Sequence, residues 1–130
     1  MKIIEYFPAV LVLLLLSSCA TETEDCICTD EFRVITVLII NETGSPVEGL
    51  QTTVRDEKGK SYNPEEGTLY AGYYSIMTDK YVTDFTTDSK KIYFTASSDS
   101  MNVNGEYFIN TDRCRCHINK ISGPDTLVIK

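Results

Sequence analysis

The sequence predicts an all-β protein that folds as a single antiparallel β-sandwich of seven to eight short strands. Two observations lead to this prediction. Short runs of apolar, β-branched and aromatic residues are separated by clusters rich in Gly, Pro, Asn and Asp, which is typical of strands joined by turns. After the N-terminal region, no segment places its apolar residues with the 3.6-residue period of an amphipathic helix. With 130 residues, of which 42% are hydrophobic, the chain can bury one modest core but cannot form two domains.

The first part of the domain contains three expected strands. Residues 33–40 are β-branched and nearly all apolar, which indicates a strand that is buried on both faces or central to a sheet. Residues 50–54 alternate in polarity, so their apolar side chains share a face. Residues 69–77 are rich in tyrosine, which has a high β-propensity. Clusters of turn-forming residues separate these strands, at 41–46, 56–59 and 63–67.

The second part contains four further expected strands, at 91–96, 106–109, 113–119 and 126–129. Asn104 and Gly105 predict a hairpin turn between the first two of these, because both residue types accept the positive φ angles of a two-residue turn. The stretch 79–89 fits either an edge strand or a loop. Its three aspartates lack the spacing of a calcium-binding loop, so we expect them to be solvated.

The N-terminal residues have the features of an exported protein. Lys2 is followed by an apolar run at 9–16, which is too short to span a membrane, and then by small residues. The letters LSSC at residues 16–19 resemble the lipobox of bacterial lipoproteins. The resemblance implies that a signal peptide, residues 1–18, is removed and that Cys19 is acylated on its sulfur and on its new amino group. The alternative is an ordinary secretory signal with an incidental cysteine.

The lipobox also divides the rest of the chain. Residues 19–25 contain three acidic side chains and form an expected solvated tether, and residues 26–130 form the expected β-sandwich domain. The tether resembles the acidic export signal of surface-exposed lipoproteins of the Bacteroidota, although a plain flexible spacer has the same composition. We therefore expect a protein of the outer membrane, held at the cell surface by the lipid on Cys19.

Four of the five cysteines lie after Cys19 and form two Cys-x-Cys pairs. An even number of cysteines in an exported chain predicts disulfides. Residues two apart in a strand share a face, so two such strands side by side would set two thiols opposite two others. Antiparallel neighbours would join the first cysteine to the fourth and the second to the third, whereas parallel neighbours would join the first to the third and the second to the fourth. Either pairing ties the start of the domain to its end through Cys26, Cys28, Cys114 and Cys116.

A metal site is the alternative use of these residues. The four thiols and His117 are ligand types that zinc accepts. However, adjacent residues of a strand point to opposite faces, so Cys116 and His117 would not converge on one ion. We therefore expect no metal, and we expect His117 to be a surface residue of a strand.

Residues 44–54, GSPVEGLQTTV, are similar to the opening of transthyretin-like, carboxypeptidase-regulatory-like domains. The later G-x-Y-x-I element of that family matches residues 72–76, whereas Thr52 replaces a residue that is usually apolar. The resemblance implies a seven-stranded sandwich of the prealbumin-like, Ig-like type. It also implies an accessory or binding module without chemistry of its own.

The composition narrows the function further. A net charge of −7 without a basic cluster argues against nucleic-acid binding. The single histidine and the absence of GxSxG, HExxH and P-loop motifs argue against an enzyme, and no cofactor is expected. Exposed tyrosines are favoured at recognition surfaces, so the expected binding residues are Tyr62, Tyr73 and Tyr81.

The function that these observations favour is binding. The module is expected to serve as an accessory subunit of an outer-membrane or surface complex, with an envelope protein or a glycan as its partner. Two alternatives stay open. The first is a purely structural envelope lipoprotein without a specific ligand, and the second is a metal-binding or thiol-redox protein that uses the two Cys-x-Cys pairs.

Overall fold

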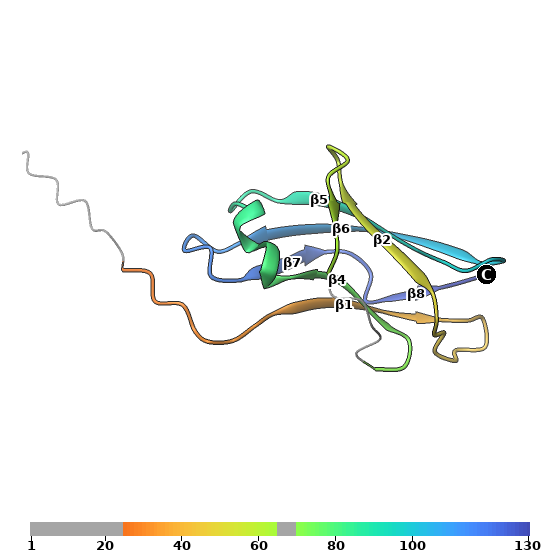
Figure 1. Cartoon of the computed structure of the whole chain (residues 1–130). Coiled ribbons are helices and arrows are strands. Elements are labelled where there is room, and N and C mark those ends of the chain that lie inside the picture. The colour runs from red at the N-terminus through yellow and green to blue at the C-terminus, as the bar shows by residue number, and fades with distance from the viewer. Residues whose placement is uncertain (1–24, 65–69) are drawn as a thin grey trace, which may run out of the picture.

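The computed structural model describes residues 25–64 and 70–130, which form a mostly β protein with two sheets (Figure 1). The expected all-β class, with its strands in two sheets, is therefore confirmed. The only helix among the described residues is a short 3₁₀ helix, η1. In chain order the elements are β1 (Val34–Ile40), β2 (Gln51–Asp56), β3 (Ser61–Tyr62), β4 (Tyr73–Thr78), η1 (Asp79–Asp84), β5 (Lys90–Ser97), β6 (Asn102–Thr111), β7 (Ile118–Ser122) and β8 (Thr126–Val128).

The smaller sheet has the order β4-β1-β8, and the larger sheet has the order β3-β2-β5-β6-β7. All neighbours are antiparallel except β1 and β8, which run parallel, so the expectation of a purely antiparallel sandwich is wrong at this pair. The reason is the connection. The chain crosses from the larger sheet at β7 to the smaller sheet at β8, so no hairpin turn fixes the direction in which β8 pairs.

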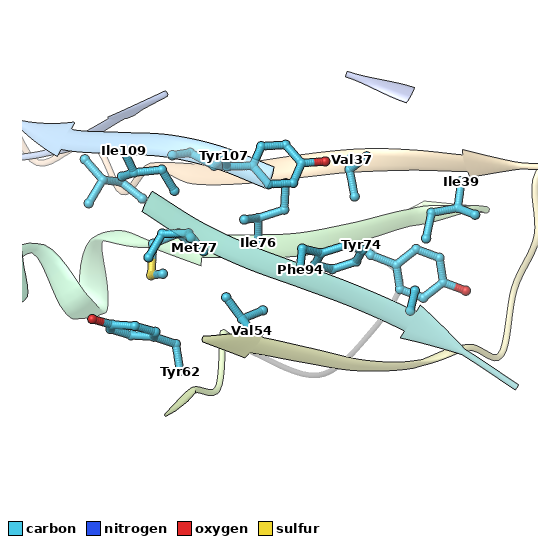
Figure 2. Close-up of a cluster of buried hydrophobic side chains, with 14 of the residues drawn as sticks. Val37, Ile39, Val54, Tyr62, Tyr74, Ile76, Met77, Phe94, Tyr107 and Ile109 are labelled. Atoms are coloured by element: carbon cyan, nitrogen blue, oxygen red, sulfur yellow. The ribbon is translucent and has the colours of Figure 1, made fainter. Parts of the chain in front are cut away.

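The core lies between the two sheets (Figure 2). Alternate residues of β1 enter it, and Val37 and Ile39 are completely buried there. The larger sheet contributes the same alternation from β5, where Ile92 and Phe94 are buried while their neighbours face outward. The two-residue period predicted from the sequence is thus the period with which the strands fill the core.

The two glycine motifs of the sequence meet in the structure. The Tyr74 hydroxyl donates a hydrogen bond to the Val47 carbonyl oxygen at 2.9 Å and accepts one from the Leu50 N–H at 3.2 Å. Gly72 has a φ of +77°, and a Cβ at this position would lie 2.7 Å from the Pro46 Cβ. The motif at residues 44–54 therefore forms a turn before β2, and the motif at residues 72–76 holds that turn through the contacts of Gly72 and Tyr74.

The hairpin turn expected at Asn104 and Gly105 is wrong, because both residues lie inside β6 and the turn falls at residues 98–101. Gly105 pairs with Phe94 in extended backbone. A Cβ there would lie 2.8 Å from the Tyr107 ring. The glycine is present to make room for an aromatic side chain on its own strand, and not to form a turn.

Other expected boundaries also shift. The strand expected at 113–119 begins only at Ile118, because residues 113–117 form a loop. The strand expected at 69–77 begins at Tyr73, and Leu69 lies outside the described residues. The stretch 79–89 starts with η1 rather than an edge strand. The two-residue strand β3 carries too short a pattern to be predicted.

The contact between the motifs predicts different costs for two alanine substitutions. Gly72→Ala should destabilise the fold by about 1–3 kcal/mol more than Gly59→Ala, because its methyl group must displace Pro46. Gly59 is the matched control, since it has a similar φ of +80° but nothing within 4 Å of a Cβ. Urea unfolding of the two variants measures the difference. Equal losses would show that φ alone, and not the packing on Pro46, requires glycine at position 72.

Candidate functional site

The residues before β1 are joined to a distant loop by two disulfides. Cys26 pairs with Cys114 and Cys28 with Cys116, with Cα–Cα distances of 5.4 and 5.3 Å. The structure therefore contains long-range disulfides with the pairing expected of parallel neighbours. We call residues 25–33 the clasp, because they run beside the loop that links β6 to β7.

Neither Cys-x-Cys pair lies in a strand, which corrects the reason given for the pairing. Arg115, between the two cysteines of the loop, has a φ of +53°. Asp112 forms the turn, because its carbonyl oxygen accepts the Arg115 N–H and its carboxylate accepts the Cys116 N–H, each at 3.0 Å. A turn, and not a β-ladder, thus presents the second pair of cysteines to the clasp.

His117 is buried, so its expected place on the surface of a strand is wrong. Its side chain is 8% exposed, its Nδ1 lies 2.7 Å from Asp79 Oδ2, and its Nε2 lies 3.0 Å from Thr29 Oγ1. The partners are 38 and 88 residues away in the sequence. Burial of a polar ring requires such partners, and the sequence alone did not indicate them.

Asp79 is the centre of this cluster and is not the solvated acid that was expected. Its carboxylate also accepts the N–H of Arg33 at 2.8 Å and the N–H of Ile118 at 2.9 Å. Burial by itself would raise the pKa of Asp79. The hydrogen bonds from His117 and the two backbone N–H groups outweigh burial and hold its pKa below the ordinary value.

The order hydroxyl, imidazole, carboxylate in Thr29, His117 and Asp79 is also the order of a Ser-His-Asp catalytic triad. Catalysis needs in addition a set of donors placed around a developing oxyanion. Among the described residues, the bond to His117 is the only hydrogen bond of the Thr29 side chain. The contacts of the cluster join the clasp, η1 and the start of β7.

A second buried cluster surrounds Tyr62, whose expected exposure is wrong because only 5% of the residue is accessible. Its hydroxyl donates to Asp56 Oδ2 at 3.1 Å, and Lys90 Nζ lies 3.9 Å from the same oxygen. Burial and the neighbouring Asp56 raise the pKa of Tyr62. Burial would raise the pKa of Asp56 as well, but hydrogen bonds from Lys60, Tyr62 and Lys58 lower it overall.

The three tyrosines expected to bind do not form one surface. Tyr81 packs edge-on against Tyr62, with ring centroids 5.2 Å apart, and its hydroxyl bonds the backbone of Asn63. Tyr73 lies on β4 in the other sheet and is 38% exposed. Tyr62 therefore belongs to the packing of the larger sheet, and a binding role for Tyr73 and Tyr81 stays a prediction.

The outer face of the larger sheet carries a group of side chains that sequence reasoning missed. Tyr93 on β5 and Phe108 on β6 are 39% and 37% exposed. Lys91 Nζ lies 5.3 and 5.8 Å from these two ring centroids and 2.8 Å from a Glu106 carboxylate oxygen. We call these four residues the β5–β6 patch. The alternation of β5 with buried Ile92 was the available signal, because it places residues 91 and 93 outside.

Within residues 25–64 and 70–130, no group of three or more His, Cys, Asp or Glu side chains is arranged to hold a metal ion. The helical structure in the same part of the chain is not long and apolar enough to cross a membrane. Compared with family models, with curated proteins and with solved structures, the chain matches none of them. Its function must therefore be argued from its own residues.

The two disulfides should be strongly non-additive. Replacing Cys26 and Cys114 by serine leaves the other disulfide to close nearly the same 88-residue loop in the unfolded chain. Loss of either disulfide alone should therefore cost up to about 2 kcal/mol, and loss of both up to about 6 kcal/mol. Chemical denaturation of the two double variants and the quadruple variant measures this. Single losses as large as the combined loss would contradict the account.

The Asp79 cluster predicts acid sensitivity. Because the pKa of Asp79 in the folded chain lies below its ordinary value of 3.8, its carboxylate stabilises the fold above that pH, and this stabilisation is lost as the pH falls further. Asp79→Asn should cost about 1–3 kcal/mol at pH 7 and flatten the fall in stability below pH of about 4. Unfolding measured from pH 7 to 2 tests this, and an unchanged acid dependence in the variant would contradict it.

Proposed function

We propose that this protein is a lipid-anchored, non-catalytic interaction module of the bacterial cell envelope. Removal of residues 1–18 and acylation of Cys19 would leave the short tether 19–25 before the β domain. The support for the anchor is the LSSC motif at its expected distance from the N-terminus. Several acyl chains on one cysteine hold a protein at a membrane stably, whereas one chain does not. The outer membrane, at the cell surface, is the proposed location.

The β5–β6 patch is the observation that carries the binding role. Aromatic rings that remain over a third exposed on a rigid sheet lose little entropy on binding, and tyrosine and arginine are enriched where interfaces concentrate their energy. Here Tyr93 lies between Arg55 on β2 and Glu106 on β6, its paired neighbours. The patch thus combines aromatic rings, which are enriched at the centre of protein interfaces, with Lys91 and Glu106, whose charges are typical of an interface rim.

The proposed fold family is the transthyretin-like, carboxypeptidase-regulatory-like group. The contact of Tyr74 with Val47 and Leu50 supports this, because it joins the two sequence elements that carry the resemblance. The close approach of Gly72 to Pro46 supports it for the same reason. In that family the module is an accessory to another protein. An accessory subunit of an outer-membrane or surface complex is therefore the proposed role.

A thiol-redox function is the second candidate. Cys26 and Cys28 are exposed, and their partners Cys114 and Cys116 are only partly buried. A reductant could therefore reach both disulfides. Exchange with another protein's thiols would release the clasp. Counting free thiols in protein taken directly from the envelope separates the two roles. An interaction module keeps both disulfides, whereas a redox protein shows a reduced fraction.

The patch predicts position-dependent crosslinking in intact cells. A photoreactive amino acid in place of Tyr93 should give a product with one neighbour, because this residue lies inside the proposed interface. Val128, which is 47% exposed on the other sheet, is the matched control and should give none. Tyr93→Ala combined with Phe108→Ala should abolish capture at other patch positions in a chain that still folds. Equal products from positions 93 and 128 would contradict the proposal.

The nature of the product identifies the partner. A discrete band that mass spectrometry assigns to one envelope protein supports the accessory role. A heterogeneous product that glycan-degrading enzymes remove shows instead that the patch binds a glycan.

A further inference from the structure

The clasp end of the molecule exposes apolar side chains on a rigid support. Ile27 lies between the two disulfide-bonded cysteines of the clasp and is 90% exposed. Phe32, five residues later, is 57% exposed. An isoleucine on a flexible segment could fold back on the protein surface, but the disulfides on both sides of Ile27 hold it in place. The residue is therefore kept in water by the covalent structure of the clasp.

An arginine lies across the two disulfides from this apolar side chain. Arg115 occupies the same position between the disulfides on the loop as Ile27 occupies on the clasp, and it is exposed. An isoleucine opposite an arginine suits a phospholipid interface, where apolar groups enter and a guanidinium group binds phosphate.

The chain outside the structure leads to the same partner. Only seven peptide links separate Cys19 from Cys26, and this length spans at most about 25 Å. If Cys19 carries the lipid, Cys26 and its neighbour Ile27 cannot move farther than this from the bilayer surface. In Figure 1 the clasp, coloured orange, leaves one end of the molecule, and the turn at residues 98–101 lies at the opposite end.

We propose that the clasp end is a membrane-contact surface, in which Ile27 enters the lipid interface and Arg115 binds a phospholipid phosphate. The inference rests on the proposed lipid anchor at Cys19. The partner is the bilayer itself, and the contact fixes how the domain stands on it. The β5–β6 patch then lies on the side of the molecule and the turn at 98–101 points away from the lipid.

A single tryptophan reports the contact, because the chain contains none. The lipidated chain with Ile27→Trp is reconstituted in vesicles of phosphatidylethanolamine and phosphatidylglycerol with brominated acyl chains. Its fluorescence should shift to the blue and be quenched relative to unbrominated vesicles. Ser100→Trp, at the opposite end, is the control and should be neither shifted nor quenched. Both positions are exposed, so the substitutions leave the fold intact.

A charge change tests the role of Arg115. In the Ile27→Trp chain, Arg115→Glu should reduce the quenching, whereas Arg55→Glu, an exposed arginine on β2, should leave it unchanged. Equal effects of the two substitutions would overturn the proposed phosphate contact.

Sedimentation of the same vesicles separates this inference from the anchor. Protein that does not sediment with vesicles lacks the anchor, and the proposed function fails. Protein that sediments but shows no quenching at position 27 is anchored while its domain stands away from the lipid, and this result overturns the membrane-contact surface alone.

Discussion

The structure depends on the buried carboxylate of Asp79, which holds the clasp to the segment that begins β7. Three segments meet there: Arg33 at the end of the clasp, η1, which begins at Asp79, and Ile118 at the start of β7. His117 forms a further hydrogen bond to the Asp79 carboxylate, and its other ring nitrogen bonds the Thr29 hydroxyl. A buried carboxylate must accept several hydrogen bonds to remain ionised, so the loss of any of these segments weakens the hold of the other two. The disulfides then make this connection covalent.

This connection between the clasp and the loop before β7 explains why two disulfides hold a segment that contributes no side chain to the core. All residues from 25 to 32 are exposed and none lies in a strand. Because the clasp is fixed to the loop before β7, the point at which the tether meets the domain moves from the start of β1 to Cys26. A lipid anchor would then hold one end of the sandwich close to the membrane, while the faces of the sheets stay free. The β5–β6 patch lies on one of those faces.

Much of the fold could be predicted, because alternation and turn chemistry act over a few residues. The strands at 33–40 and 91–96 followed from this. The tie between the two Cys-x-Cys pairs was also expected, although from a pairing of strands that the structure does not contain at these residues. The site could not be predicted in the same way. Asp79 and His117 are 38 residues apart, and nothing near either residue indicates the other. The turn predicted at Gly105 was wrong because this position requires glycine to leave room for the ring of Tyr107. The parallel pairing of β8 depends on the crossing of the chain from one sheet to the other after β7, and no short sequence pattern indicates that crossing.

The clasp is joined to the loop before β7 by disulfides between the first and third and between the second and fourth cysteines of the two Cys-x-Cys pairs, and disulfide mapping tests this most directly. Only Ile27 separates the clasp cysteines, so the unreduced protein must be fragmented along the backbone on both sides of that residue in a mass spectrometer. We expect fragments that link Cys26 to Cys114 and Cys28 to Cys116, with no free thiol. Links from Cys26 to Cys116, or cysteines that carry free thiols, would contradict this pairing.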